Sequence, residues 1–425
     1  MNERHIIVVG AGLAGLCAAR TIQRAGHNAV LYEASDGVGG RVRTDVVEGF
    51  LLDRGFQVLF TAYPAIRQEI DLEALHLRVF DPGAIVCWNG KRHVVADPLR
   101  APLKGIETAF TSLFPWGDKL NVARLSLLLR GMSVRQIFDM PDQTMGEFLA
   151  TFGFTPAIID RFFRPFFAGV FLEADMVTSA RMFAFVYKML AEGQTTIPEK
   201  GMGALPQQIA DSLAPGSLHL NSPVESLILR NGRVIGVTLR DGSRVESDSV
   251  ILATEFDAAA RLAGLDIPAT WRVSTDICFA LPEPLYCEKL LTLFTEQSLP
   301  KRNLVNNASV VSNIAPSYAP EGQHLLSATV LGKHSLSDTA LAGAVKAEIG
   351  AQYPNANTDG WRLLRVYHLH HAQFAQPAGI WDHLPDTRTP LPGLILAGEI
   401  TAQSSLHGAL ISGQRAAGLA MSVRE

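Results

Sequence analysis

The chain has 425 residues, of which 48% are hydrophobic and 18% charged, and it contains 36 glycines. This composition excludes a disordered or fibrous protein and predicts a globular α/β enzyme, and the length favours two interleaved domains over one. The formal net charge of −4 argues against a nucleic-acid partner, because binding nucleic acid requires a concentrated basic surface.

Cysteine spacing and hydropathy indicate where the protein works. Cys17, Cys87, Cys278 and Cys287 form no C-x-x-C pair, so we expect no metal site and no disulfide framework. The pattern favours a cytoplasmic protein. No uncharged apolar stretch of about 18 residues predicts a transmembrane helix, and peripheral contact with a membrane surface is kept as an alternative.

The first residues of the chain predict a strand, a tight turn and a helix. The apolar run 6–9 leads into Gly10-Ala11-Gly12-Leu13-Ala14-Gly15, after which helical spacing continues to Gly26. In a dinucleotide-binding turn, Gly10 permits the bend, Gly12 lets the backbone approach a pyrophosphate and Gly15 lets the helix pack closely on the strand. The free N–H groups at the helix start then point at the phosphates.

The next strand is predicted over residues 28–32 and ends at an acid. There the Glu33 carboxylate can accept both hydroxyls of a ribose, and it would repel a 2′-phosphate. Residues 37–44 follow as a second glycine-rich loop that carries Arg41 and Arg43, a feature that a plain NAD-binding fold does not require. This arrangement resembles the flavin amine oxidase superfamily, which also holds protoporphyrinogen oxidases and phytoene-desaturase-like enzymes.

The C-terminal residues carry a second part of the same resemblance. Residues 391–399 predict a turn, a buried strand and a final acid, Glu399, and a segment over 405–413 then leads into the closing helix. In the superfamily the acid meets the ribityl and diphosphate region of FAD, and the helix start faces the flavin ring. Many members have Asp where this chain has Glu399. Since the segment contains no cysteine, the resemblance implies non-covalent FAD.

The resemblance also implies a fold. It is of the α/β class, with a Rossmann-type FAD-binding domain like that of glutathione reductase and an inserted α+β substrate domain. We expect the FAD-binding domain to comprise residues 1–75, 200–260 and 390–425, and the substrate-binding domain to comprise 76–199 and 261–389, a helical insertion plus a mixed sheet. The residues expected at FAD are Gly10, Gly12, Leu13, Ala14, Gly15, Glu33, Ala34, Gly39, Gly40, Arg41, Gly55, Val224, Gly398, Glu399, Leu406 and Ala409.

Two features of the expected substrate side bear on function. Residues 161–171 hold five phenylalanines, which predict core packing, the lining of an apolar substrate tunnel or contact with a membrane. The candidate catalytic side chains are Gln57, on the segment expected beside the flavin, and His371, near the end of the second insertion.

We therefore expect an FAD-dependent oxidoreductase that removes hydride from a small, largely apolar organic substrate, a polyene or a polycyclic compound, and passes electrons to oxygen or a quinone. Three alternatives stay open. They are an amine oxidase, for which we find no convincing aromatic pair to cage an amine, a redox-neutral isomerase of carotenoid type, and a non-catalytic FAD-binding protein. The sequence predicts no particular oligomeric state.

Overall fold

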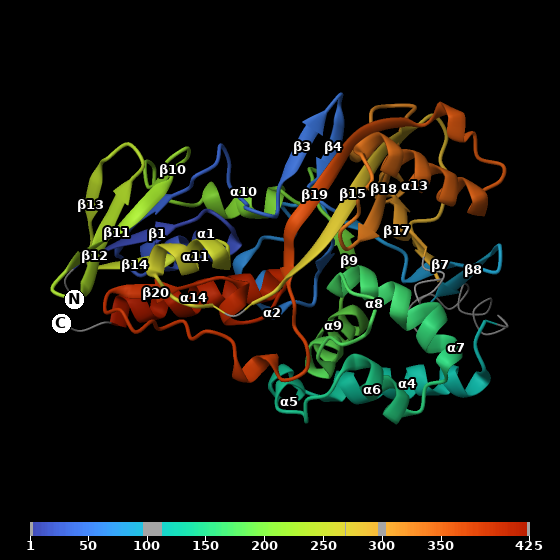
Figure 1. Ribbon diagram of the computed structural model, residues 1–425, viewed down its shortest axis with the longest axis horizontal. Helices are drawn as coiled ribbons and strands as arrows, with labels where there is room; N and C mark the ends of the chain where they lie inside the picture. Colours follow the sequence, from blue (N-terminus) through green and yellow to red (C-terminus); the bar gives the residue numbers. More distant parts are fainter. Residues whose placement is uncertain (1–2, 97–112, 268, 296–302, 423–425) are drawn as a thin grey trace.

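The computed structural model describes residues 3–96, 113–267, 269–295 and 303–422. Two regions are evident in Figure 1: a parallel sheet with its covering helices, near both ends of the chain, and a mixed sheet accompanied by a group of helices. The long strands β15 (Trp271–Leu281) and β19 (Arg362–Phe374) pair with each other and run from one region into the other.

The first region contains a five-stranded sheet in which every pairing is parallel. Its strands come from the beginning, the middle and the end of the chain. Parallel neighbours of this kind need crossover connections, and these are supplied here by helices and by long insertions. In spatial order the strands are β10 (Leu218–His219), β2 (Asn28–Tyr32), β1 (His5–Val9), β14 (Ser249–Leu252) and β20 (Leu394–Leu396).

Alternate side chains of these strands fill two different cores, as the period of a strand requires. Ile6 and Val8 belong to the core that includes α1 (Leu13–Arg24) and α14 (Leu406–Ser422). Ile7 and Val9 belong to a second core, formed with α11 (Phe256–Ala263) and a three-stranded antiparallel sheet. The predicted α/β class is therefore confirmed. The antiparallel strands are β11 (Val224–Arg230), β12 (Arg233–Leu239) and β13 (Arg244–Glu246).

The second region is built around a seven-stranded mixed sheet that joins both predicted insertions. Strand β7 pairs in parallel with β16, although the two lie about two hundred residues apart in the chain, and the other pairs are antiparallel. Helix α13 (Asp338–Gln352) packs into the core on one side of this sheet. Besides β15 and β19, its strands are β7 (Gly83–Trp88), β8 (Lys91–Ala96), β16 (Leu291–Phe294), β17 (Val305–Val310) and β18 (His324–Leu331).

Helices α4 to α9 form a separate group at one side of the mixed sheet (Figure 1). Ser133 and Thr144 begin α5 and α6 with capping boxes, in which each hydroxyl accepts a bond from the backbone N–H three residues on. The group comprises α4 (Trp116–Gly131), α5 (Val134–Phe138), α6 (Met145–Phe152), α7 (Pro156–Ile158), the π-helical turn η1 (Ile159–Phe163), α8 (Arg164–Phe171) and α9 (Ala180–Glu192).

The phenylalanine-rich stretch lies inside this group of helices. Phe163, Phe167 and Phe171 are buried, and the first two pack against Phe183 of α9. The Arg161 side chain donates to the carbonyl of Leu113 and lies over the Trp88 ring. These three phenylalanines are therefore core residues, as one of the three interpretations predicted.

Short elements complete the two regions and the connections between them. They are β3 (Thr44–Val47) and β4 (Phe50–Asp53), which form a hairpin, β5 (Leu59–Phe60), β6 (Arg78–Val79) and β9 (Thr195–Ile197), which form a small sheet, the helices α2 (Pro64–Glu69), α10 (Ala204–Ala210) and α12 (Val311–Ile314), and the 3₁₀ turns η2 (Pro316–Tyr318), η3 (Thr358–Gly360), η4 (Ile380–Asp382) and η5 (Glu399–Thr401).

Across the part of the chain that the structure describes, no helix combines the length and apolar character needed to cross a membrane. The same residues contain no group of three or more His, Cys, Asp or Glu side chains that could hold a metal ion. All four cysteines have free thiols, and only that of Cys287 is exposed.

Candidate functional site

The start of α1 and the second glycine-rich loop face each other as bare backbone. The backbone N–H of Gly39 donates to the carbonyl of Ala11 over 2.8 Å, and Gly40 lies opposite Gly12. No atom lies within 4 Å of the position that a Cβ on Gly12 would take. No side chain caps Gly12, the N-cap of α1, so the first N–H groups of the helix present their partial positive charge to this space.

Gly15 has a different function in the same turn. A Cβ there would overlap the carbonyl oxygen of Gly10, which itself has a φ of +102°. Both residues therefore have to be glycine so that α1 can pack against β1 and the turn can form. The predicted roles of packing and bending are confirmed by this geometry.

Glu33 lies where β2 ends, beside the same turn. One carboxylate oxygen accepts the N–H of Ala11 over 2.7 Å, and the other accepts the N–H and the hydroxyl of Ser35. A carboxylate offers about four acceptor positions, so one remains on the oxygen that faces Ala11. Val224 begins β11 two residues after Ser222, whose N–H donates to the carbonyl of Glu33.

An ion pair joins the second glycine-rich loop, residues 37–44, to the C-terminal segment 391–399. The Arg41 guanidinium lies 2.5 Å from the Glu399 carboxylate, and the other oxygen of Glu399 accepts the hydroxyl of Ser404 over 2.8 Å. Arg41 also donates to the carbonyl of Ala372 over 3.1 Å. Gly398, just before the acid, has a φ of +126°. The sequence predicted both charged residues at the cofactor without predicting that they bind each other.

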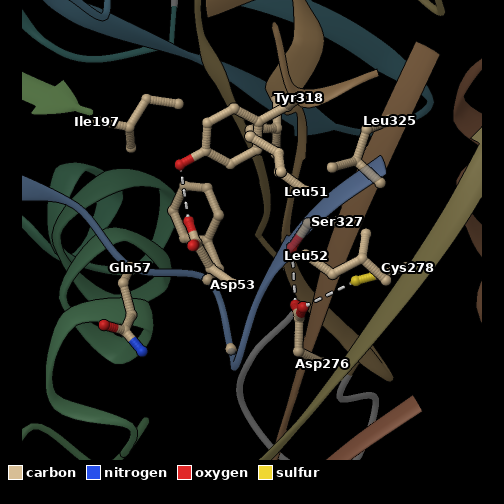
Figure 2. A pocket seen from close by; sticks show the side chains of 13 residues that line it. Leu51, Leu52, Asp53, Gln57, Ile197, Asp276, Cys278, Tyr318, Leu325 and Ser327 are labelled. Carbon is tan, nitrogen blue, oxygen red and sulfur yellow. Dashed lines mark hydrogen bonds between the residues drawn. The ribbon is translucent and has the colours of Figure 1, made fainter. Parts of the chain in front are cut away.

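A small cavity lies between this area and the mixed sheet, with about 20 Å³ of free space. Figure 2 shows two carboxyl groups at it, one from β4 and one from β15, among mostly apolar side chains. Asp53 accepts the Tyr318 hydroxyl over 2.9 Å, and Asp276 accepts the Ser327 hydroxyl over 2.7 Å. The lining residues are Leu51, Leu52, Asp53, Gly55, Phe56, Gln57, Ile197, Asp276, Cys278, Val311, Tyr318, Leu325 and Ser327.

Burial dominates the electrostatics of this cavity. It raises the pKa of Asp53 to about 6, against hydrogen bonds from Thr44, Met202 and Tyr318 that favour the ionised form. It also raises the pKa of Asp276 to about 7, and the neighbouring charge of Asp53 adds to the rise. The sequence analysis did not assign a role to these two acids. The available signal was an acid within the apolar run 276–281, which is unusual for a buried strand.

The structure places the two candidate catalytic side chains differently. Gln57 lines the cavity, but its amide nitrogen donates to the carbonyls of Arg41 and Arg54, so the side chain holds the chain in position. His371 does not line the cavity. Its ring is stacked on Trp271 and lies 2.7 Å from the Glu255 carboxylate, with 40% of its side chain exposed.

A family model described as flavin containing amine oxidoreductase matches residues 13–421. The chain belongs to this family. It is therefore an enzyme, a flavin-dependent oxidoreductase. Two curated relatives with named activities are distantly similar to the chain. A 15-cis-phytoene desaturase from Synechococcus elongatus is 22% identical and covers 96% of this chain and 94% of its own length. A probable zeta-carotene desaturase from the same organism is 25% identical, with coverage of 97% and 98%.

A solved structure has the same fold. A putative protoporphyrinogen oxidase from Exiguobacterium sp. 255-15 superposes with a TM-score of 0.75 over 100% of both chains, at 18% sequence identity. At this identity the likeness concerns the fold alone. It agrees with the predicted α/β fold class.

The residues of this chain fit a flavin cofactor with a diphosphate. Open space above Gly12 and the uncapped start of α1 suit an anionic group, and the acceptor position left on Glu33 suits a hydroxyl. Leu406 and Ala409, on the first turn of α14, are half-buried and pack against the core that includes α1. Ala34 is exposed beyond Glu33. The individual contacts of these residues with a cofactor remain predictions.

Proposed function

We propose that this flavoenzyme binds FAD non-covalently and removes hydride from a largely apolar organic substrate, either a polyene or a polycyclic compound. The observation that carries the proposal is the bare backbone between Gly12 and Gly40, with the Glu33 carboxylate beside it. A dinucleotide fits such a place because the diphosphate needs close backbone approach and the ribose needs an acceptor. The two desaturases that resemble the chain over its whole length support the class of substrate.

Each part of the chain has a limited task in this proposal. Gly12 and Gly40 admit the diphosphate, Glu33 orients the ribose, and the Arg41–Glu399 pair holds the two ends of the chain in register. When bound, FAD would supply the hydride acceptor, and the two electrons and the proton would pass on to oxygen or a quinone. The segment from Gly55 to Gln57 borders the small cavity with mostly apolar walls; because its free space is only about 20 Å³, its walls would have to move apart to admit an apolar substrate there. Positioning accounts for most of the catalysis that side chains contribute.

Amine oxidation is a second candidate, and one observation favours it. The carboxyl groups of Asp53 and Asp276 both line the cavity, and an ammonium group placed there would pair with them. Since burial raises the pKa of Asp276 to about 7, such binding would strengthen as the pH rises through neutrality. A polyene carries no charge, so its binding would lack this dependence.

Anaerobic reduction of the flavin tests the proposal. The visible spectrum of the purified protein is followed while phytoene, protoporphyrinogen and a primary amine are added in turn, and oxygen or a quinone is admitted afterwards. We expect bleaching by one of the two apolar compounds and recovery with an acceptor. Bleaching by the amine alone would favour the second candidate. A bound flavin that no compound bleaches would favour an isomerase or a binding protein, and a chain that cannot take up FAD would refute the proposal.

A further inference from the structure

Helix α4 exposes a line of large apolar side chains. Trp116, Leu120 and Leu127 are 64%, 68% and 68% exposed, and their spacing of four and seven residues places them on one face of the helix. Leu128 beside them is 48% exposed. Of the ten large hydrophobic residues that are exposed in the described part of the chain, these four lie on a single helix. We call Trp116, Leu120, Leu127 and Leu128 the α4 stripe.

The opposite face of α4 packs normally. Leu125 and Leu129 are fully buried against the other helices. Asp118, the one acid of this helix, is also buried, and its carboxylate accepts the backbone N–H of Thr155 over 2.9 Å. The helix therefore has a complete inner face, and the apolar line on its outer face is additional to what folding requires.

Basic side chains border the α4 stripe. The Lys119 ammonium lies 4.4 Å from the centre of the Trp116 ring. Arg124 lies over the Phe152 ring and is exposed, and Arg130 donates to the carbonyl of Ala191 at the C-terminal end. Since Asp118 is buried, the exposed charges of the helix are all positive. A surface with apolar residues flanked by cations complements the acyl chains and phosphates of an anionic lipid layer.

We propose that α4 docks on the surface of a membrane that contains anionic lipid. In this arrangement the helix lies in the plane of the interface, with Leu120 and Leu127 among the acyl chains and Trp116 at the depth of the headgroups. Lys119, Arg124 and Arg130 reach lipid phosphates. A protein partner fits less well, because interfaces between proteins bury about 800 Å² on each side, whereas the α4 stripe consists of four side chains along one helix. The inference goes beyond the proposed function and depends on α4 alone.

Vesicle flotation tests this docking on the full-length protein. The vesicles contain phosphatidylcholine and phosphatidylglycerol in equal parts. Two proteins are compared on them, the unchanged protein and a double variant that carries Leu120→Asp and Leu127→Asp. We expect the unchanged protein to float with the vesicles and the double variant to lose about tenfold in partitioning, because both buried apolar contacts become charged. Binding should also weaken with phosphatidylcholine alone and at high salt, which screens the cations.

A matched control separates docking from general surface change. Leu229, on β11, is 55% exposed and remote from α4 in the chain, so Leu229→Asp should float like the unchanged protein. A second double variant, Leu120→Ser with Leu127→Ser, should also lose binding. It replaces the aspartate variant as the test if the aspartates lower the melting temperature of the protein. The proposal is overturned if the unchanged protein does not float, if the double variants float equally well, or if light scattering shows a dimer that the same variants dissociate.

Discussion

At the scale of single residues, the least expected feature is the pair of acids at the cavity. Asp276 accepts a hydrogen bond from the Ser327 hydroxyl, and the Cys278 thiol lies 3.4 Å from its second oxygen. No cation pairs with either Asp53 or Asp276 among the described residues. A buried carboxyl with neutral neighbours and a second acid nearby keeps its proton at higher pH, which explains the raised pKa values of about 6 and 7.

Asp276 should therefore make stability depend on pH. Its folded pKa of about 7 exceeds the usual 3.8, so its stabilising contribution is complete below pH 3.8 and is lost as the pH rises through about 7. Asp276→Asn cannot ionise and should lose less stability between pH 6.5 and 8.5, by about 1 kcal/mol, because the loss from Asp276 levels off above its folded pKa. Urea unfolding across this range measures the difference. Parallel curves for the two proteins would show that the carboxyl ionises normally.

A second buried group, His407, contributes little to the change in stability between pH 6.5 and 8.5. Burial lowers the pKa of His407 to about 4, so its contribution has the opposite sign, present above pH 6.5 and lost as the pH falls towards 4. Above pH 6.5 His407 is neutral in the folded chain and loses its remaining proton in the unfolded chain, so its contribution changes by only a few tenths of a kcal/mol, about the same in both proteins. Asp53 titrates in the same direction as Asp276, so some loss of stability at high pH should remain in the variant.

At the scale of elements, two glycines at the start of α1 have different roles. Gly15 is needed for folding, and Gly12 leaves room for a bound group. Gly12 has a φ of −71° and open space where a side chain would go, whereas a side chain on Gly15 would overlap Gly10. We expect Gly12→Val to fold with nearly unchanged stability and to lose bound flavin, because the valine fills the space for the diphosphate. Gly15→Val should lose about 3 kcal/mol or more and fold poorly. Urea unfolding and the visible absorbance of the purified variants measure both effects.

Two results would contradict this division. If Gly12→Val retained a full complement of flavin, the cofactor would not approach the helix start. If Gly12→Val and Gly15→Val were equally unstable, the open space at Gly12 would not exist in solution. Either result would count against the binding site as placed here and would leave the family assignment intact, because that assignment rests on nearly the whole chain.

How much of these elements could be predicted depends on the range of the interactions. The strand, turn and helix over residues 5–24 follow from local backbone demands, so the glycine spacing predicted them. The cavity could not be predicted, because Asp53, Asp276 and Tyr318 come from separate segments that only tertiary packing joins. The α4 stripe was also missed. Leucines at helical spacing predict a buried face, and Leu125 and Leu129 meet that expectation while Leu120 and Leu127 do not.

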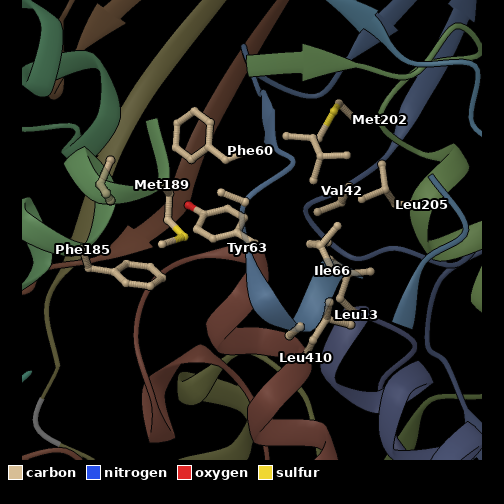
Figure 3. Packing of buried hydrophobic residues seen from close by; sticks show 14 of the residues in the cluster. Leu13, Val42, Phe60, Tyr63, Ile66, Phe185, Met189, Met202, Leu205 and Leu410 are labelled. Carbon is tan, nitrogen blue, oxygen red and sulfur yellow. The ribbon is translucent and has the colours of Figure 1, made fainter. Parts of the chain in front are cut away.

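At the scale of the whole molecule, the cofactor region depends on both ends of the chain. Figure 3 shows Leu13 of α1, Ile66 of α2 and Leu410 of α14 packed together beside the second glycine loop. Helices α1 and α14 make one of the most extensive helix contacts in the structure, and a Cβ added at Gly413 would lie 2.3 Å from the carbonyl oxygen of Ala14. A residue near the C-terminus thus helps to set the position of a helix whose start is at residue 13.

Gly413→Leu should therefore impair a cofactor site formed mainly by the first forty residues. A side chain at Gly413 would overlap the carbonyl of Ala14, so α14 would have to move away from α1 and disturb the 2.9 Å hydrogen bond from the Gly398 N–H to the Ser412 hydroxyl, next to Glu399. We expect a loss of about 3 kcal/mol in the free energy of unfolding and a reduced flavin content. Gly418→Leu is the matched control, because Gly418 lies on the same helix and has no atom within 4 Å of an added Cβ. This variant should keep its free energy of unfolding and its flavin content. Thermal unfolding and the ratio of visible to protein absorbance provide the measurements, and equal behaviour of the two variants would mean that the two helices are not tightly packed in solution.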